Sequence, residues 1–205
     1  MSFYNNYILP NLTDFVCRLA LVNRQRQKIV PLAFGKVLEV GLGSGLNLPF
    51  YDHTKVEKLW GLEPSPRSMQ KAKKRSATVK FKIDFLESSV MQIPLESCSA
   101  NCILTTYTLC TLPDIKGALQ EIARVLKPQG QLIFCEHGKA PDPEVSCWQD
   151  RLNPFWKTFS GGCNLNRDIP HLITRNGFSI KQMQSGYISK PRTLSYHYWG
   201  IATHC

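Results

Sequence analysis

The sequence predicts an α/β fold in which a mostly parallel sheet is wound with helices on both faces. Three observations lead to this prediction: short apolar segments recur along the chain, the intervals between them are long enough for crossover helices, and the first segment ends in a glycine-rich turn. The chain has 205 residues, enough to bury one hydrophobic core. We therefore expect a single domain over residues 1–205.

Strands are predicted where apolar runs are bounded by turn-forming residues. The first covers residues 36–40 and feeds a turn that contains three glycines, as a buried parallel strand does. Further strands are expected at about 58–63, 79–86, 101–106, 131–136, 178–187 and 195–203. Because no helix separates the last two, we expect them to pair as an antiparallel hairpin at the sheet edge.

Helices are predicted from apolar stripes at helical spacing and from capping residues. An amphipathic helix is expected over residues 11–24, with Leu12, Phe15, Val16 and Leu19 on one side. A second helix should begin after Ser65 as N-cap, with Pro66 at its first position. The best-marked helix follows Asp114, and residues 127–130 close it. A shorter one is expected near 167–175.

The segment from residue 139 to 165 has a different character, because prolines and glycines interrupt it and no helical stripe is visible. We expect it to be rich in loops. Its aromatic residues are Trp148, Phe155, Trp156 and Phe159. They could line an apolar acceptor pocket, but aromatic residues at such spacing more often close a core.

The composition is that of an ordinary globular protein, with 43% hydrophobic and 20% charged residues. The net charge of +10 favours an anionic partner. Its densest run, residues 71–75, falls on the expected solvent face of a helix and holds no aromatic residue on which bases could stack. We therefore do not expect a nucleic-acid partner, and we allow for peripheral contact with an anionic membrane surface.

Eight cysteines are scattered without a C-x-x-C pair, so the spacing of zinc or redox sites is missing and no metal site is predicted. We interpret them, Cys163 included, as reduced side chains that behave as apolar residues. No apolar stretch reaches the length of about eighteen residues that a membrane span needs, and the first residues do not resemble a secretory signal. We expect a cytoplasmic protein.

The clearest candidate site is the run Glu-Val-Gly-Leu-Gly-Ser-Gly at residues 39–45, between a strand and a helix. Glycines there let the backbone approach a ligand closely. Eighteen residues beyond Gly45, at the end of the second strand, Glu63 is placed to accept hydrogen bonds from both hydroxyls of a ribose. The pattern therefore predicts a loop that binds a nucleoside cofactor.

The residues around this loop discriminate between cofactors. Nicotinamide and flavin sites require a third glycine where this chain has Leu46, and a leucine side chain would crowd the contact between helix and strand. The loop has no lysine to hold phosphates, and Glu39 precedes it. This combination favours a cationic ligand without phosphates.

Three motifs are similar to those of class I S-adenosylmethionine-dependent methyltransferases: E-V-G-x-G-S-G at 39–45, L-E-P-S at 62–65 and L-K-P-x-G at 126–130. The likeness covers nearly the whole chain. It implies a Rossmann-like, doubly wound sheet of seven strands, mostly parallel with an antiparallel last strand, and S-adenosylmethionine as cofactor.

Shorter peptides narrow the resemblance. They are L-N-L-P at 46–49, L-C-T at 109–111, E-H at 136–137 and G-C-N-L at 162–165, followed by Arg167. They resemble alkyl-thiol S-methyltransferases and their bacterial relatives, some labelled phospholipid N-methyltransferases. The acceptor implied is a small thiol, with an amine or phospholipid headgroup as the nearest variant.

The resemblance implies a cofactor site built from Glu39, Gly41, Gly43, Gly45, Asn47, Glu63, Pro64, Ser89, Val90 and Thr106. By this likeness the glycines border the methionine part of the cofactor, Glu39 supports its amino group and Glu63 holds the ribose. Where relatives often carry an acid for the adenine amino group, this chain has Ser89 and the backbone of Val90. Within the single domain we expect three parts: a helical lid (1–30), a cofactor-binding core (35–138), and a substrate-side segment with the closing hairpin (139–205).

Methyl transfer from a sulfonium is an in-line displacement, so the enzyme mainly has to hold, align and desolvate the acceptor. A thiol acceptor must lose its proton. His137, just past the fifth strand, is the best-placed base, with Glu136 orienting it. The alternative is a hydrogen-bonded turn histidine. Thr106 and Tyr107 either face the acceptor or cap a turn.

The expected N-terminal helix could cover the cofactor as a lid, with Tyr4, Tyr7 and Phe15 in contact with it, or lie on a membrane, or simply pack on the domain. Two other functions remain open. The chain could be a non-catalytic binding protein with a methyltransferase fold, or a nicotinamide oxidoreductase, although Leu46 disfavours the latter.

Overall fold

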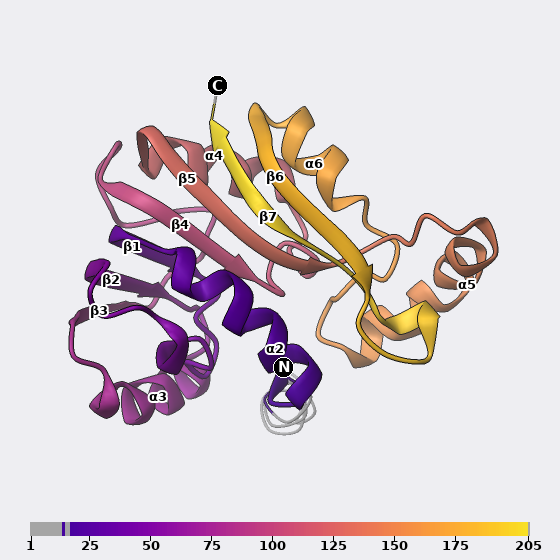
Figure 1. Cartoon of the computed structure of the whole chain (residues 1–205), viewed down its shortest axis with the longest axis horizontal. Helices are drawn as coiled ribbons and strands as arrows, with labels where there is room; N and C mark the ends of the chain where they lie inside the picture. Colours follow the sequence, from indigo (N-terminus) through magenta and orange to yellow (C-terminus); the bar gives the residue numbers. More distant parts are fainter. Residues whose placement is uncertain (1–13, 15–16, 205) are drawn as a thin grey trace.

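The structure is a computed structural model that describes Asp14 and residues 17–204. Seven strands form one sheet in the order β3-β2-β1-β4-β5-β7-β6 (Figure 1). They are β1 (Gly35–Val40), β2 (Val56–Leu62), β3 (Lys82–Leu86), β4 (Ala100–Thr106), β5 (Leu126–His137), β6 (Phe178–Tyr187) and β7 (Tyr196–His204). The predicted α/β fold with a seven-stranded, doubly wound sheet is therefore confirmed.

Strand directions follow the expected pattern. Neighbours from β3 to β5 pair in parallel, whereas β7 is antiparallel to both β5 and β6. The last two strands form the predicted hairpin, with β6 at the sheet edge. The strand predicted to begin at residue 79 begins at Lys82, after a short 3-10 turn.

Helices connect the strands at the predicted places, with one exception described below. The α-helices are α2 (Ala20–Ile29), α3 (Pro66–Arg75), α4 (Ile115–Val125), α5 (Pro143–Phe159) and α6 (Ile169–Arg175), and the 3-10 helices are η2 (Val30–Leu32), η3 (Leu48–Phe50), η4 (Ser76–Thr78) and η5 (Arg192–Leu194). Both predicted N-caps are present. The Ser65 hydroxyl accepts from the Ser68 amide at 3.4 Å, and the Asp114 carboxylate accepts from the Gly117 amide at 3.0 Å.

The helix predicted over residues 11–24 lies partly outside the described residues. Asp14 and Cys17, which fall within it, are helical, and a separate helix, α2, covers Ala20–Ile29. Leu19, a member of that stripe, is exposed. The other members, Leu12, Phe15 and Val16, lie outside the described residues, as do Tyr4 and Tyr7.

The segment predicted to be rich in loops contains a long helix instead, because α5 spans 17 residues from Pro143 to Phe159. Its face toward the domain is polar. The Gln149 amide bonds to Ala140 N and Gly138 O, and the Asn153 carbonyl oxygen accepts from Leu165 N at 2.8 Å. An apolar stripe facing inward is therefore missing, and that stripe is the usual sign of a helix in a sequence.

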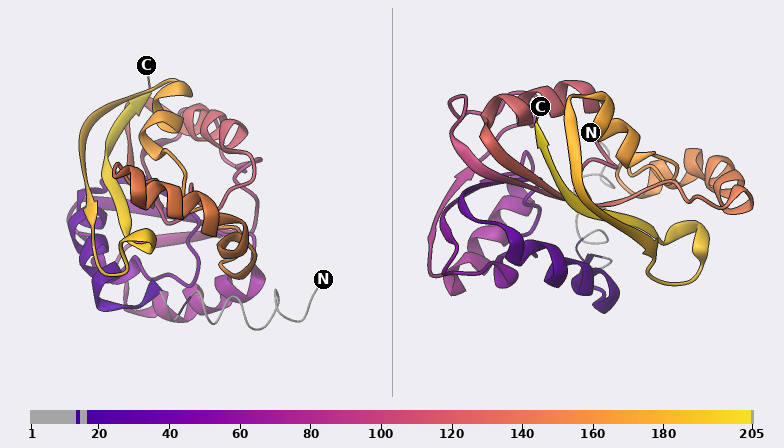
Figure 2. Two further views of the ribbon diagram at one scale, coloured as in Figure 1. Left: turned by 90° about the vertical axis from the view of Figure 1, so that its right-hand side faces the viewer. Right: turned by 45° about the horizontal axis from the view of Figure 1, so that its top comes forward.

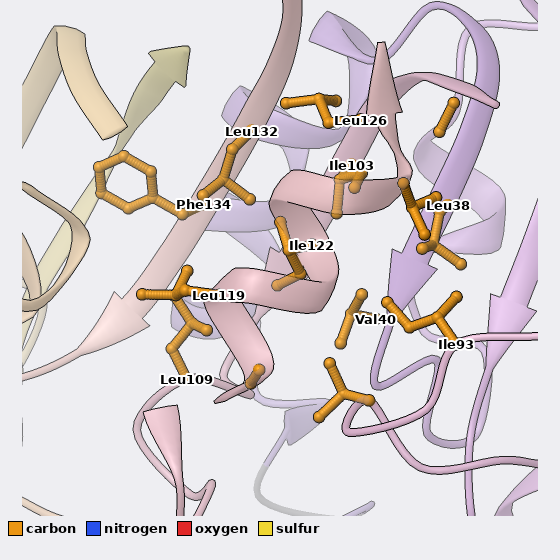
Figure 3. Close-up of a cluster of buried hydrophobic side chains, with 14 of the residues drawn as sticks. Leu38, Val40, Ile93, Ile103, Leu109, Leu119, Ile122, Leu126, Leu132 and Phe134 are labelled. Atoms are coloured by element: carbon orange, nitrogen blue, oxygen red, sulfur yellow. The ribbon is translucent and has the colours of Figure 1, made fainter. Parts of the chain in front are cut away.

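Two hydrophobic clusters fill the two sides of the sheet. One packs α4 and α6 against the strands, with Leu119, Ile122 and Phe134 fully buried (Figure 3). The other packs α2 and α3 against the opposite face, with Met69 and Cys102 in it. Figure 2 shows these helix pairs on opposite sides of the sheet, in its right-hand view. The result is a three-layer sandwich that holds the strand ends rigidly.

The strand register brings three chain segments level with one another. Val40 of β1 pairs with Leu62 of β2 and with Thr105 of β4. The next residues along the chain are Gly41, Glu63 and Thr106, which therefore lie at one edge of the sheet. From this edge the chain after β1 runs to one half of the sheet, and the chain after β4 runs to the other half. Open α/β sheets bind ligands at such a point.

Candidate active site

A cavity of about 450 Å³ opens at this edge of the sheet. The predicted cofactor residues Glu39, Gly41, Gly43, Glu63, Pro64 and Thr106 line it. Gly45 and Asn47 lie just behind the lining, and Ser89 and Val90 lie outside it. The structure therefore brings most of the predicted cofactor residues together around one cavity.

The three glycines of the loop all have positive φ, but they differ in what surrounds them. A Cβ at Gly41 would collide with the Thr108 side chain, so this glycine allows the loop after β4 to approach. A Cβ at Gly45 would lie 2.8 Å from Leu48 Cδ1 and 3.1 Å from Ala72 Cα, so this one lets α3 pack closely. Among the described residues, only the Gly41 carbonyl oxygen comes within 4 Å of a Cβ added at Gly43. Gly43 thus keeps the cavity itself free.

Glu63 directly follows β2, and both of its carboxylate oxygens bind backbone amides. They accept hydrogen bonds from Gly43 N and Ser65 N, each at 2.9 Å. Burial raises the pKa of Glu63 above its ordinary value, and the two amides act against this shift. The carboxylate thus has a fixed position in the cavity wall with free lone pairs for ligand hydroxyls.

Glu39 lies at the bottom of the cavity in a buried polar network. It accepts from the Asn47 amide at 2.9 Å and from the Tyr51 hydroxyl at 2.7 Å. Burial raises the pKa of Glu39 to about 7, although these hydrogen bonds and the charge of Arg26 oppose the shift. Asn47 also donates to Thr106 Oγ1 at 2.9 Å, which links the glycine loop to β4.

Arg26 of α2 was not predicted as a site residue, although its guanidinium is buried in the cavity wall. It donates to Asn47 Oδ1 at 2.6 Å and to Thr106 Oγ1 at 3.3 Å, and it lies 5.4 Å from the centre of the Tyr107 ring. Its Nε is buried without a hydrogen-bond partner in the described part of the chain. A buried donor of this kind is suited to an anionic group on a ligand.

Asp14, which precedes α2, also reaches the loop. Its carboxylate accepts from the Ser44 hydroxyl and pairs with Arg18 at 2.5 Å and Arg75 at 3.3 Å. Arg75, from the basic run on α3, in turn donates to the Ser44 carbonyl. That run was predicted to lie on the solvent face of the helix, but its last residue, Arg75, binds the cofactor loop. A sequence pattern cannot show such contacts, because residues far apart in the chain make them.

The side chains of the predicted catalytic pair, Glu136 and His137, have different partners. The Glu136 carboxylate accepts from Thr108 N at 3.1 Å and Cys110 N at 3.2 Å, so it holds the loop after β4. It forms no hydrogen bond with His137 among the described residues, because side chains of successive strand residues point to opposite faces. Burial raises the pKa of Glu136 to about 7, and the amides oppose the shift.

His137 is buried behind the cavity wall. Its Nδ1 lies 3.6 Å from Cys163 Sγ, and its ring packs at 5.4 Å from that of His197. Within the described chain its Nε2 has no hydrogen-bond partner. Cys163, interpreted from the sequence as a structural residue without a base beside it, therefore has an imidazole next to its sulfur.

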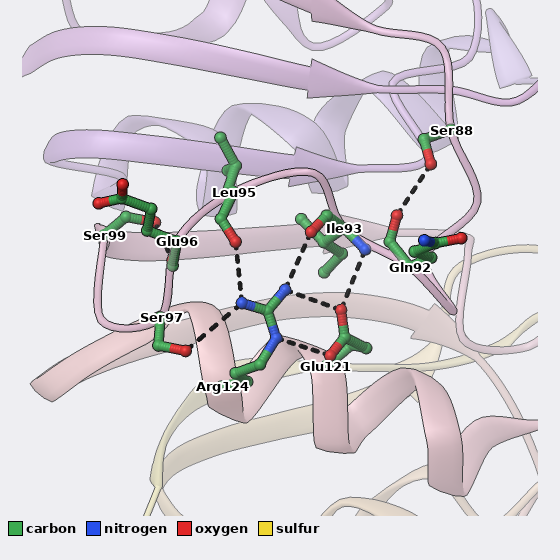
Figure 4. A network of polar contacts seen from close by, with 9 residues as sticks. All are labelled: Ser88, Gln92, Ile93, Leu95, Glu96, Ser97, Ser99, Glu121 and Arg124. Carbon is green, nitrogen blue, oxygen red and sulfur yellow. Dashed lines mark hydrogen bonds and ion pairs between the residues drawn. The ribbon is translucent and has the colours of Figure 1, made fainter.

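Ser89 and Val90 follow β3 on a segment that α4 holds in place. Ser89 is exposed, and its hydroxyl accepts from Met91 N, whereas the Val90 side chain belongs to the core. Figure 4 shows how Arg124 ties this segment down: its guanidinium donates to the carbonyls of Leu95 and Ile93 at 2.8 and 2.9 Å. Contact between this segment and an adenine ring stays a prediction.

The aromatic residues of α5 neither line the cavity nor close the core. Trp148, Phe155 and Phe159 have exposed fractions of 53%, 70% and 63%. Figure 1 shows α5 at the edge of the molecule, away from the sheet. Only the residues just after it, Ser160 and Gly161, reach the cavity. The helix turns these three side chains outward, so the expectation that they close a core is wrong, whereas Trp156 is half-buried and its Nε1 is fully buried.

Comparisons with known proteins agree with this geometry. Residues 38–134 match a family model described as a methyltransferase domain. The chain is 30% identical over 152 residues to the rat thiol S-methyltransferase TMT1B and 28% identical over 155 residues to the human thiol S-methyltransferase TMT1A; in each case the match covers 72% of this chain and 62% of the relative. The chain belongs to the class I S-adenosylmethionine-dependent methyltransferases.

The solved structures show the same fold. One chain of the complex between the Haloferax volcanii Trm112 methyltransferase activator and a methyltransferase superposes with a TM-score of 0.74 at 17% identity, covering 100% of this chain and 98% of that one. The chain spans less than two thirds of the length of the rat and human relatives that it matches.

The charges of the cavity fit the family's cofactor. Among the described residues, the charged side chains that line it are Asp14, Glu39, Glu63 and Arg26. S-adenosylmethionine carries a sulfonium, an ammonium and one carboxylate, and it has no phosphate. A wall with three acids and one guanidinium complements that distribution, whereas a dinucleotide would place its pyrophosphate against carboxylates.

The described residues include no helix that is long and apolar enough to cross a membrane. They also include no cluster of three or more histidine, cysteine or acidic side chains able to hold a metal ion.

Proposed function

We propose that this chain transfers the methyl group of S-adenosylmethionine to a small thiol. The observation that carries the cofactor half of the proposal is the acidic cavity with its single buried guanidinium, at the carboxyl edge of β1, β2 and β4. The thiol half is supported by the relatives named as thiol S-methyltransferases. When bound, the cofactor supplies an electrophilic methyl group on a positively charged sulfur.

Each cavity residue has a role in holding the cofactor. Glu63 accepts the ribose hydroxyls, Gly43 leaves room for the methionine part, and Glu39 pairs with its ammonium group. We assign the carboxylate of the methionine part to Arg26, because its Nε is buried and unpartnered within the described chain. Asp14 and Cys17, which line the cavity ahead of α2, cover this end of it and exclude water from the sulfonium.

The acceptor faces the uncharged part of the cavity wall. That part comes from the loop after β4 and from the turn after α5, and it comprises Tyr107, Thr108, Thr111, Leu112, Ser160 and Gly161. Glu136 is a positioning residue that fixes this loop through two backbone amides. His137, just behind the wall, stays our candidate for the base that removes the thiol proton.

The test is a transfer assay with methyl-labelled cofactor and three acceptor classes: small thiols, small primary amines, and vesicles that contain phosphatidylethanolamine. We expect label on thiols, loss of transfer in Glu63→Gln, and wild-type transfer in Asp84→Asn, whose carboxylate pairs with Lys58 outside the cavity. Faster labelling of amines would replace the thiol by an amine. Cofactor binding without transfer to any acceptor would favour a non-catalytic binding protein.

A second proposal concerns peripheral contact with an anionic membrane surface. It is supported by the inverted character of α5, which turns Trp148, Leu152 and Phe155 to solvent. Arg151 lies with its guanidinium 5.4 Å from the Trp148 ring, so a cation accompanies the aromatic face. Aromatic rings beside basic side chains suit the interface of an anionic bilayer.

Sedimentation with vesicles of phosphatidylcholine, with and without phosphatidylserine, tests this contact at two salt concentrations. We expect binding only to the anionic vesicles, weakened by salt and lost when Trp148 and Phe155 are both replaced by alanine. The matched control replaces Leu32 and Met183, two exposed apolar residues elsewhere on the surface. Equal binding by both double variants would contradict the proposal.

A further inference from the structure

Two cysteines approach each other beside the cavity. Cys110 lies in the loop after β4, and Cys163 lies in the turn between α5 and α6. Their sulfurs are 3.7 Å apart, and Cys163 Sγ is also 3.6 Å from Nδ1 of His137. Both cysteines are free thiols. The three side chains come from three separate segments, so only the fold brings them together.

Backbone contacts on either side hold the two cysteines at this distance. Asn164, next to Cys163, donates to the Cys110 carbonyl through its amide N–H at 2.9 Å and through its side chain at 3.0 Å. Arg167 binds the carbonyls of Leu109 and Leu112 at 2.5 and 2.6 Å. The approach of the sulfurs is therefore a built feature of the fold.

The two thiols have different surroundings. The hydrogen bond with Cys110 and then that with His137 hold the pKa of the Cys163 thiol well below its ordinary value, although burial opposes them. The hydrogen bond with Cys163, together with burial, raises the pKa of the Cys110 thiol. Cys163 is partly exposed, whereas Cys110 is only 1% exposed. One thiol is thus an accessible nucleophile and the other a protected partner.

We propose that Cys110 and Cys163 form a dithiol site that low-molecular-weight disulfides oxidise to an intramolecular disulfide. The proposal stands independently of the methyl acceptor, because it rests only on the geometry of these side chains. Neither cysteine belongs to a C-x-x-C pair, so the spacing in the sequence gives no sign of this site.

The reaction has two exchange steps. The Cys163 thiolate attacks one sulfur of a disulfide RSSR, which forms a Cys163–S–S–R bond and releases RS⁻. The Cys110 thiol then loses its proton and attacks the Cys163 sulfur, which closes the Cys110–Cys163 bond and releases a second RS⁻. Two protein thiols are oxidised, RSSR is reduced to two thiols, and the protons of the cysteines pass to the released thiolates.

Oxidation has a consequence for the cavity. The sulfurs must move from 3.7 Å to about 2.05 Å apart, the length of a disulfide bond. This movement draws the loop after β4 toward the turn after α5, and both carry residues of the cavity wall, among them Thr111 and Gly161. Cys163 also loses its hydrogen bond with His137, because a disulfide sulfur carries no proton. We therefore expect the oxidised protein to bind acceptors less well than the reduced protein.

The first test treats the full chain with glutathione disulfide, blocks the remaining thiols with iodoacetamide, and maps cysteine pairs by peptide mass spectrometry. We expect a peptide pair joined through Cys110 and Cys163, reversed by dithiothreitol. Alkylation of both cysteines, under conditions where the exposed Cys98 and Cys147 carry glutathione, would overturn the proposal. A bond from Cys163 to Cys17 would equally overturn the assignment of Cys110.

Variants separate the two steps. Cys110→Ser should stop at a stable mixed disulfide on Cys163, whereas Cys163→Ser should leave Cys110 as a free thiol that iodoacetamide alkylates once the protein is unfolded. The control Cys147→Ser, on the exposed face of α5, should form the internal disulfide at the wild-type rate. His137→Asn should slow alkylation of Cys163 by about ten-fold at neutral pH, because its thiolate loses a partner. An unchanged alkylation rate would remove His137 from the site.

Discussion

At the end of β1, Glu39 combines deep burial with hydrogen bonds that favour its charged form. Burial is the larger effect, so the carboxyl titrates near pH 7 in the free protein. A cofactor ammonium next to it would reverse that balance by supplying an opposite charge. Cofactor binding should therefore be coupled to loss of a proton from this residue.

The coupling predicts a pH dependence. A carboxyl whose pKa rises on folding stabilises the free protein below the unfolded value of about 4.3, and this stabilisation is lost as the pH rises through about 7. Because binding requires the carboxylate, the Kd for S-adenosylmethionine should rise on the order of five-fold from pH 7.4 to pH 6, measured by calorimetry. Glu39→Gln should bind weakly at both pH values. An equal Kd of the wild type at both would contradict this role.

The glycines of the loop should separate folding from binding. Gly45→Ala places a methyl group against Leu48 and Ala72 at positive φ, and should lower the free energy of unfolding by about 1–3 kcal/mol. Gly43→Ala meets no side chain, should cost about 1 kcal/mol, and should lose cofactor affinity because its methyl group occupies the cavity. Urea unfolding and calorimetry measure the two quantities. The reverse order of effects would show that the glycine roles are misassigned.

At the scale of elements, the segment before α2 acts on the cofactor loop through Asp14. Its carboxylate connects Ser44 of the loop with Arg75 of α3. Asp14→Ala should therefore weaken cofactor binding about five-fold, because one charge-assisted hydrogen bond that orders the loop is lost. Asp52→Ala, which removes a partly exposed acid bonded to the nearby Thr54 and Lys55, is the matched control. Equal Kd values for the two variants would remove the lid from the account.

The α4 helix holds the segment after β3 in place through Arg124. Arg124→Ala removes hydrogen bonds to the Leu95 and Ile93 carbonyls and a pair with Glu121, and should lower the free energy of unfolding by about 1–2 kcal/mol. Gln120→Ala, at an exposed position of the same helix, should change it by less than about 0.5 kcal/mol. Similar urea midpoints for both variants would show that Arg124 contributes nothing to this segment.

Elements with local signals could be predicted from the sequence. The strand before the glycine loop and the helices capped by Ser65 and Asp114 depend on neighbours in the chain, and all three are present. The α5 helix could not be predicted, because the residues that face the domain are the polar Gln149 and Asn153. The usual rule that an apolar stripe faces inward fails for such a helix.

The candidate site divides in the same way. Glu39 and Glu63 stand at strand ends next to a glycine loop, and the sequence shows both strands and loop. Arg26 and Cys163 reach the site only through contacts with residues far away in the chain. Glu136 was predicted at the right place but with a different role, since its partners are backbone amides of the neighbouring strand's loop.

At the scale of the whole molecule, two buried clusters clamp the sheet from both sides, so the carboxyl edge of β1, β2 and β4 is a rigid platform. The fold alone does not determine the reaction, because one fold serves many chemistries. The charges placed on this edge are specific. Among the described residues that line the cavity, Glu39 suits a positive group, Arg26 suits a negative group and Glu63 suits ligand hydroxyls.

The most direct test of this account is calorimetric titration of the full chain with S-adenosylmethionine, S-adenosylhomocysteine and NADH, repeated on Glu63→Ala and on Asp84→Ala. We predict that the first two ligands bind, that NADH does not, and that binding is lost in Glu63→Ala and kept in Asp84→Ala. Binding of NADH, or unchanged binding of S-adenosylmethionine by Glu63→Ala, would contradict the account of the cofactor site.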